Sequence, residues 1–469
     1  MSEDAALALH QKKLEKDFSS RLLLVNQEAE LTRLTRLTSH PQILRATKND
    51  EDSLKMALWR ALFLEITAPF DRELARPILR MKEAIDAVGA GFLDLDLPRF
   101  ENFIRNLCYS ARMKDGRSLE GHFAGTPAII TGGGPTLRKL APHLGEISQR
   151  ALIFSGGAAV TALMREKITP DFIAALDGAS SSTRNASFAN CRAPLFFQIS
   201  AASAILAQAK GDLLYLPESS YHFEQWLCEK AGYPSGIFDS GWTVVNFQMA
   251  IARHLGCSPI ILAGVDLCGN RADLYAAKTD LSDGGWLPLS DSGFSGDAGK
   301  LLTRRDWLIS KEWIEEFANS SELWRIHPSQ LPIEGARIVT LADLQALPEI
   351  EKKMPQNFPH IQPLPFEIGN EIAESEECLK RLLTLIESAY PNSPLEGLPW
   401  LLAIKELEKS AVYGHFLLPI WSVWVHIFNR EKKITACPLH FEVNRILFLQ
   451  NTLAKLEAIW SKRAQPTHC

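Results

Sequence analysis

The sequence predicts an α/β protein with a central Rossmann-like, mostly parallel sheet, flanked by helical N- and C-terminal regions. Two observations carry this prediction. Between residues 121 and 348, short apolar runs without charges alternate with amphipathic stretches. Such alternation is typical of parallel strands that are buried on both faces and joined by helices. Outside that range, leucines recur mostly at three- and four-residue spacing, which indicates helices.

Six uncharged apolar runs are the expected strands of the sheet. They are residues 128–130, 151–154, 172–176, 195–197, 213–216 and 260–263. The helical stretches between them predict parallel pairing, because parallel neighbours need a crossover connection.

Composition divides the chain into four expected segments. They are a mainly helical region at 1–120, which includes Leu22, Leu23 and Leu24; the Rossmann-like domain at 121–348; a Pro-rich linker at 349–366; and a helical domain at 367–469. The length of 469 residues is ample for several domains with deep cores.

Charge and cysteine content exclude several classes of protein. The 50 Lys+Arg and 55 Asp+Glu residues give a net charge of −5, which argues against a dedicated nucleic-acid-binding protein. The eight cysteines form no Cys-x-x-Cys pair, so neither a disulfide framework nor a zinc site is expected. The N-terminus has no secretory signal, and the longest strongly apolar run, 416–428, is shorter than the roughly 20 residues that span a bilayer. We therefore expect a cytoplasmic protein.

The sharpest local signal is a glycine loop after the first expected strand. Gly132, Gly133 and Gly134 follow that strand, and Pro135 and Thr136 begin a helix. Glycines permit close approach of the backbone, and a helix N-terminus presents N–H groups, so the loop suits a phosphate. The loop matches neither a Walker A nor a G-x-G-x-x-G motif. The alternative is a tight turn that needs glycine for its geometry alone.

Two further turns resemble this loop. Gly156 and Gly157 follow the second strand, and Ser240 and Gly241 precede an amphipathic helix. In an open α/β sheet such loops gather at the carboxyl ends of the strands, where ligands bind. A nucleotide lying across two adjacent strand ends would contact both glycine turns, and Ser240-Gly241 suits a second anionic group.

Two acids stand at the ends of buried strands, Asp177 and Asp266. Each is a candidate to bind a ribose hydroxyl, to hold a divalent ion or to act as a base. Helix capping is the alternative for both. No histidine occurs between His254 and His327 or pairs with Cys or acid at metal-ligand spacing, so no zinc site is expected.

Together these motifs resemble those of the motility accessory factor family. The resemblance rests on Gly-Gly-Gly-Pro-Thr-Leu137, on Pro170-Asp-Phe ending in Asp177, on Ser240-Gly241, and on Leu255-Gly-Cys-x-Pro-Ile-Ile-x-x-Gly-x-Asp-Leu267, and it spans about 121 to 345. That family shares a domain with 6-hydroxymethylpterin pyrophosphokinase-like proteins.

The resemblance implies a bacterial glycosyltransferase with a sialyltransferase-like core. Such a protein would transfer a nonulosonic, sialic-acid-like sugar from a CMP-activated donor to Ser or Thr of flagellin. The glycine loop and Ser240-Gly241 would contact the donor, the helical flanks would recognise the acceptor, and no metal would be required because CMP carries one phosphate. The sequence departs from the family pattern at Thr136 and Val265, where Ser and Gln are usual. A downstream histidine is also missing, which leaves its role vacant or taken by Asp273 or Tyr275.

Two other functions remain open from the sequence. A pterin-type pyrophosphokinase would use ATP and Mg²⁺ held by the two acids. A non-catalytic nucleotide-binding interaction protein would use the same loops without turnover. The sequence does not name the sugar, the acceptor or the oligomeric state, and an oligomer is possible.

Overall fold

The chain divides into two units, one formed by 95–373 with 454–469 and the other by 1–94 with 374–453. A nine-stranded sheet forms the centre of the first of these units. The computed structural model describes 21–25, 43–45, 63–66, 97–176, 178, 188, 191–217, 222–234, 238–270, 275, 286–289, 301–326, 331–355, 358–389, 398–421 and 438–462.

All neighbours in the nine-stranded sheet pair in parallel, in the order β15-β14-β10-β5-β6-β7-β8-β9-β4. The strands are β4 (Met113–Asp115), β5 (Ala128–Thr131), β6 (Leu152–Gly156), β7 (Phe172–Ala175), β8 (Leu195–Phe197), β9 (Leu213–Tyr215), β10 (Ile260–Ala263), β14 (Leu323–Ile326) and β15 (Arg337–Val339). The six predicted strands are among them, and the predicted fold class is confirmed.

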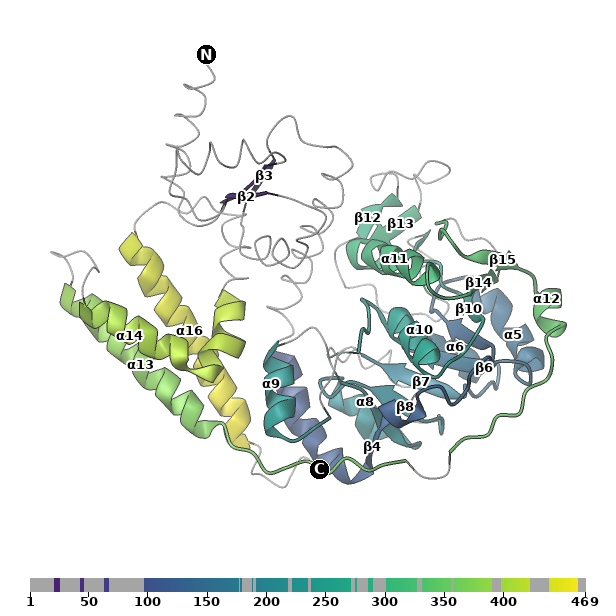
Figure 1. Ribbon diagram of the computed structural model, residues 1–469, viewed down its shortest axis with the longest axis horizontal. Helices are drawn as coiled ribbons and strands as arrows, with labels where there is room; N and C mark the ends of the chain where they lie inside the picture. Colours follow the sequence, from purple (N-terminus) through teal and green to yellow (C-terminus); the bar gives the residue numbers. More distant parts are fainter. Residues whose placement is uncertain are drawn as a thin grey trace, which may run out of the picture. The chain divides into compact units, whose positions relative to one another are not determined.

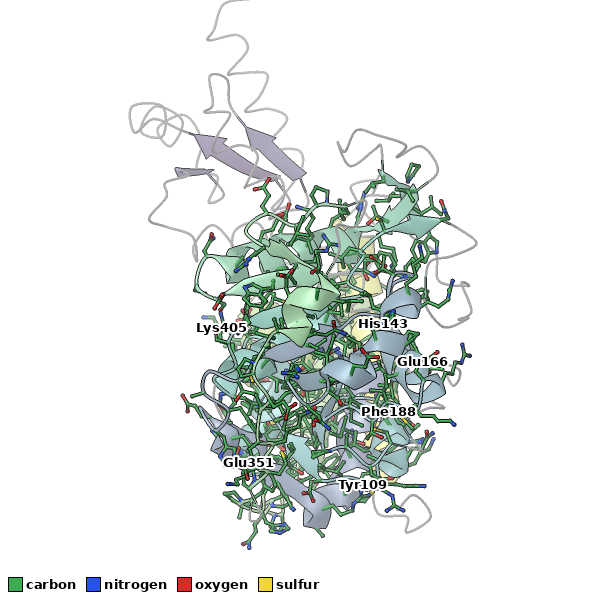
Figure 2. The ribbon with its side chains drawn as sticks, turned by 90° about the vertical axis from the view of Figure 1, so that its right-hand side faces the viewer. Tyr109, His143, Glu166, Phe188, Glu351 and Lys405 are labelled. Atoms are coloured by element: carbon green, nitrogen blue, oxygen red, sulfur yellow. The ribbon has the colours of Figure 1, made fainter. Side chains whose placement is uncertain are left out.

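Helices cover both faces of this sheet (Figure 1). They are α5 (Leu137–Ile147), α6 (Ala158–Arg165) and α12 (Leu341–Gln345) on one face, and α10 (Val244–His254) and α11 (Arg305–Ala318) on the other. Alternate strand residues supply the two cores: Ile129 packs under α5 and α6, whereas Ile130 packs under α10. Figure 2 labels His143 of α5 and Glu166 after α6, which lie on the same side of the sheet.

The strand order reverses between β5 and β10. The chain steps from β5 through β6, β7 and β8 to β9, and then returns to place β10 on the opposite side of β5. Helix α8 (Ser203–Gln208) joins β8 to β9, and the return from β9 to β10 passes through α9 (His222–Lys230) and α10. In open α/β sheets the ligand crevice forms at such a reversal, beyond the carboxyl ends of the strands. The predicted glycine loop follows β5 and therefore lies at this point.

The chain after β10 forms a second, antiparallel sheet of three strands. Its order is β11-β13-β12, formed by Gly269–Asn270, Leu301–Arg304 and Trp286–Pro288. Strand β13 leads directly into α11, so this small sheet is continuous with the α10 and α11 side of the core.

The residues that the structure describes before 97 are strands, although the sequence predicts a mainly helical region there. Three strands, β1 (Arg21–Val25), β2 (Ile43–Arg45) and β3 (Phe63–Ile66), form a parallel sheet in the order β2-β1-β3. Leu22, Leu23 and Leu24 lie in β1, and a short apolar run of this kind does not distinguish a strand from a buried helix turn. Helix 97–106 and β4 also belong to the sheet unit, although the predicted boundary placed them in the region before residue 121.

The Pro-rich segment at 349–366 packs on the sheet unit rather than running free as a linker. The Asp115 N–H donates to the Pro359 carbonyl at 2.9 Å, and the Ile361 N–H donates to the Met113 carbonyl at 3.1 Å. Prolines cannot donate, but their carbonyls and the residues between them can still pair with an edge strand. This segment therefore lies against the outer edge of β4.

The described residues after 367 form helices. They are α13 (Gly369–Ala389), α14 (Leu398–Lys409), a π-helix (Tyr413–Leu417) and α16 (Pro438–Lys462). Within their unit, Arg381 pairs with Glu406 at 2.8 Å, and Arg445 donates to the Tyr413 hydroxyl at 2.6 Å. None of the described helices combines the length and apolar character needed to cross a membrane.

Candidate functional site

The glycine loop is tied to the turn that follows β10. The Gly132 N–H donates to the Ala263 carbonyl at 2.8 Å, and the Gly134 N–H donates to the Gly264 carbonyl at 2.9 Å. A Cβ on Gly132 would lie 2.6 Å from the Gly264 oxygen, and one on Gly134 would lie 2.7 Å from the same atom. These two glycines are therefore required by the contact between the loops, as the alternative of a tight turn predicts.

Gly133 has different surroundings. A Cβ on it would lie 3.2 Å from the Ala158 Cβ, 3.6 Å from the Ala159 nitrogen and 3.7 Å from the Tyr275 ring. Gly133 thus faces the first turn of α6 and the ring of Tyr275. Of the two residues expected to stand in for the missing histidine, Tyr275 is at the glycine loop, and Asp273 lies outside the described residues.

Asp266 caps the helix that begins after the glycine loop. Its Oδ2 accepts from the Thr136 N–H at 2.8 Å, and its Oδ1 accepts from the Thr136 hydroxyl at 2.7 Å. The Asp266 side chain is buried. A carboxylate of the chain itself therefore stands at the N-terminus of α5, where the sequence predicts a phosphate. Helix capping is the alternative that the sequence offers for Asp266, and Asp266 does cap a helix. The capped helix begins 130 residues earlier in the chain.

Arg325 lies behind this carboxylate and is also buried. Its guanidinium donates to the Val265 carbonyl at 2.9 Å and to the Leu331 carbonyl at 3.1 Å. Burial lowers the pKa of Arg325, and the charge of Asp266 opposes that shift. Burial, assisted by Asp266, raises the pKa of the neighbouring Cys268 thiol to about 11. The Asp266 carboxylate thus offsets the charge of the buried Arg325 and caps the N-terminus of α5.

The second glycine turn lies beside the first. A Cβ on Gly156 would lie 2.6 Å from Val244 of α10 and 3.1 Å from the Gln248 amide nitrogen, so Gly156 is required by packing. Gly157 has a φ of 52°, and no atom of the described residues lies within 4 Å of its Cβ position. Gly157 precedes α6 and, as a glycine, supplies no side-chain cap to that helix. Gly133 lies against the same turn of α6.

The third turn is closed by its own helix. The Asn246 Oδ1 accepts from the Thr243 N–H at 3.0 Å and from the Ser310 hydroxyl at 2.8 Å, and Thr243 and Asn246 form a capping box at the start of α10. Ser240 is buried, and Gly241, with a φ of 62°, packs on Asn246 and Trp313. The capping network occupies N–H groups at the start of α10, and the Gly241 N–H donates to Asp239 Oδ1 at 3.0 Å.

The structure brings some of the predicted residues together. Gly134 and Thr136 contact Asp266, Gly132 contacts Gly264 in the same turn, and Gly133 meets α6 directly after Gly157. Ser240 and Gly241 begin the segment that leads into α10, whose Val244 packs on Gly156. Asp177 lies outside the described residues. Among those that are described, no group of three or more His, Cys, Asp or Glu side chains is arranged to hold a metal ion.

Sequence reasoning missed the side chains that hold this edge of the sheet. Gln248, fully buried on α10, points its amide nitrogen at the Thr131 carbonyl, 3.5 Å away. Asn102 and Asn106 bind the backbone after β7 and β8. A polar residue on a buried helix face is the one signal that could have found them, because such a residue needs a partner.

Comparison with known proteins identifies two similarities. Residues 101–271 match the sequence model of a family described as 6-hydroxymethylpterin diphosphokinase MptE-like. A solved structure described as the MAf glycosyltransferase from Magnetospirillum magneticum AMB-1 superposes with a TM-score of 0.56 at 15% identity, covering 98% of this chain and 84% of that chain. No curated protein sequence matches. The chain therefore has the fold of that protein, and the predicted resemblance is confirmed at the level of the fold.

Proposed function

We propose that this protein is a glycosyltransferase that moves a nonulosonic sugar from a CMP-activated donor to a Ser or Thr hydroxyl of a protein acceptor, flagellin in the first instance. The observation that carries the proposal is the fold shared with a MAf glycosyltransferase over 98% of the chain. The gathering of the predicted glycine turns at the reversal of the strand order supports it.

The donor phosphate is assigned to the N-terminus of α6 rather than to that of α5. Asp266 already occupies the donors of Thr136, whereas α6 follows Gly157, which has no side chain and no described atom within 4 Å of its Cβ position. A helix N-terminus with unoccupied N–H groups attracts an anion through hydrogen bonds and the helix dipole. Gly133 faces the same turn, so a phosphate there would lie between the two glycine turns.

The reaction that follows from this placement is a displacement at the anomeric carbon. The bond from that carbon to the CMP phosphate oxygen breaks, and a new bond forms to the acceptor hydroxyl oxygen. N–H groups at α6 stabilise the charge that develops on the leaving CMP. Asp177 is proposed to take the proton of the hydroxyl. Asp266 is assigned a supporting role, because both of its oxygens bind Thr136.

Cofactors and partners follow from the same proposal. A leaving group with one phosphate can be held by N–H donors, so no metal is required. The helical flanks are proposed to bind the protein acceptor, and neither nucleic acid nor a membrane span has a part. The proposed location is the cytoplasm, where nucleotide-activated sugars are available.

A diphosphokinase is the second candidate function, because the matching family carries that name. It would need ATP with Mg²⁺ in place of a CMP-sugar. Calorimetric titration of CMP, ATP and ADP into the full chain separates the two candidates. We expect CMP to bind in the presence of EDTA and sugar transfer to occur with a CMP-nonulosonate. Binding of ATP·Mg²⁺ without CMP binding would overturn the proposal, and nucleotide binding without turnover would leave an interaction protein.

A further inference from the structure

Helix 97–106 holds two backbone segments that lie far from it in sequence. The Asn102 amide nitrogen donates to the Gly178 carbonyl at 2.9 Å and to the Ser200 carbonyl at 3.2 Å, and its Oδ1 accepts from the Ser203 N–H at 3.2 Å. One turn later, the Asn106 amide nitrogen donates to the Ile199 carbonyl at 2.7 Å and to the Ala201 carbonyl at 2.8 Å. We call these two residues the asparagine pair.

The segments held by the asparagine pair lie at the ligand-binding edge of the sheet. Gly178 comes three residues after β7, and residues 198–203 follow β8. Parallel strands end at one edge, so both segments share that edge with the glycine loop and Gly157. A Cβ on Gly178 would lie 3.2 Å from the Ser200 carbonyl oxygen, so the two segments are in contact.

The two asparagines bind different sets of backbone groups. Among the described residues, Asn106 binds the segment after β8, whereas Asn102 bridges that segment to Gly178. Both amide hydrogens of Asn102 are used on carbonyls, and its oxygen serves α8, which has no side-chain cap of its own at Ala202. An amide is the side-chain group that can donate twice and accept at one position.

We propose that Asn102 is a positioning residue, which fixes the segment carrying Asp177 and Gly178 against the segment after β8. This inference rests on the proposed function, in which Asp177 receives the acceptor proton. An error of about 1 Å in the placement of a reacting group can lower a rate by about 100-fold, so the bridge is expected to act on turnover rather than on nucleotide binding.

The test compares Asn102→Asp with Asn106→Asp in the full chain. Each substitution replaces an amide that donates to two carbonyls with a carboxylate that cannot donate, so both should lower the melting temperature. We expect Asn102→Asp to lower kcat about 10- to 100-fold beyond Asn106→Asp, with the CMP dissociation constant changed less than about two-fold. Equal losses of kcat in the two variants would overturn the positioning role.

Hydrogen–deuterium exchange gives a readout that does not depend on sugar transfer. Peptides containing Asp177 and Gly178 should exchange faster in Asn102→Asp than in Asn106→Asp, because only Asn102 binds Gly178. Unchanged exchange in Asn102→Asp would show that the bridge fixes nothing. If the wild-type protein transfers no sugar, the proposed function fails, and the exchange comparison still decides whether Asn102 holds this segment.

Discussion

Thr136 and Asp266 are joined by hydrogen bonds from both the N–H and the hydroxyl of the threonine, so the carboxylate occupies the start of α5. This arrangement places a fixed negative charge next to the glycine loop. A second anion is not expected at the same donors, because like charges repel and the donors are occupied. We therefore expect the donor phosphate to bind at α6 and not at the start of α5.

Removal of the Asp266 carboxylate should destabilise the protein. Asp266→Ala leaves the Thr136 donors without this acceptor and the buried Arg325 without this nearby negative charge, and hydrogen bonds to a charged group contribute about 1.5–3 kcal/mol. Asp266→Asn keeps an acceptor oxygen and should cost less. Urea unfolding of both variants measures the difference. If Asp266→Asn keeps wild-type stability and loses sugar transfer, Asp266 acts on the substrate and the supporting role is wrong.

Neighbouring glycines should respond differently to substitution. Gly132→Ala should lower the free energy of unfolding by about 1–3 kcal/mol, since its Cβ would lie 2.6 Å from the Gly264 oxygen. Gly133→Val places a branched side chain against the first turn of α6 and the Tyr275 ring, and should weaken CMP binding about ten-fold or more. Thermal unfolding and calorimetry check the two effects. Gly145→Ala on α5, whose Cβ would lie 3.8 Å from the Ile168 side chain, serves as the control. Wild-type CMP affinity in Gly133→Val would remove Gly133 from the donor site.

Asp177→Asn should slow sugar transfer without a matching loss of CMP affinity. A general base contributes about 10²- to 10⁴-fold to a rate, so kcat should fall within that range. Wild-type activity should persist in EDTA. Loss of wild-type activity in EDTA would instead favour the diphosphokinase. A full rate with a lower melting temperature would show that Asp177 is a helix cap.

Two buried thiols should make stability fall at alkaline pH. Burial raises the pKa of Cys257 to about 12 and, with the charge of Asp266, that of Cys268 to about 11, against 9.0 for an ordinary thiol. Above pH 9 the unfolded chain loses these protons first, so unfolding becomes more favourable until the pH reaches the folded values. Each thiol contributes a slope of about −1 kcal/mol per pH unit in that window. Urea unfolding of wild type and Cys257→Ala from pH 8 to 11 checks this, and equal slopes would contradict it.

The sequence predicts the central strands because they are apolar on both faces, so that 128–131 and 260–263 are buried at every position. It does not predict edge strands such as β4 and β15, whose residues Met113–Asp115 and Arg337–Val339 include charged side chains. The glycine loop is visible in the sequence because three consecutive glycines stand between an apolar run and Pro135. The hydrogen bonds between Thr136 and Asp266 cannot be predicted in this way, because an apolar pattern does not show which residues 130 positions apart come together.

The Pro-rich segment at the edge of β4 bears on where this protein can be cut. An open strand edge is a template for pairing with other chains, and proteins protect such edges with prolines or by covering them. A fragment ending at residue 348 would lack Pro359 and Ile361, and one beginning at 121 would also lack β4 and expose β9. Edge-to-edge polymerisation would then compete with folding. The smallest unit that closes its own sheet therefore begins before Met113 and extends beyond Ile361.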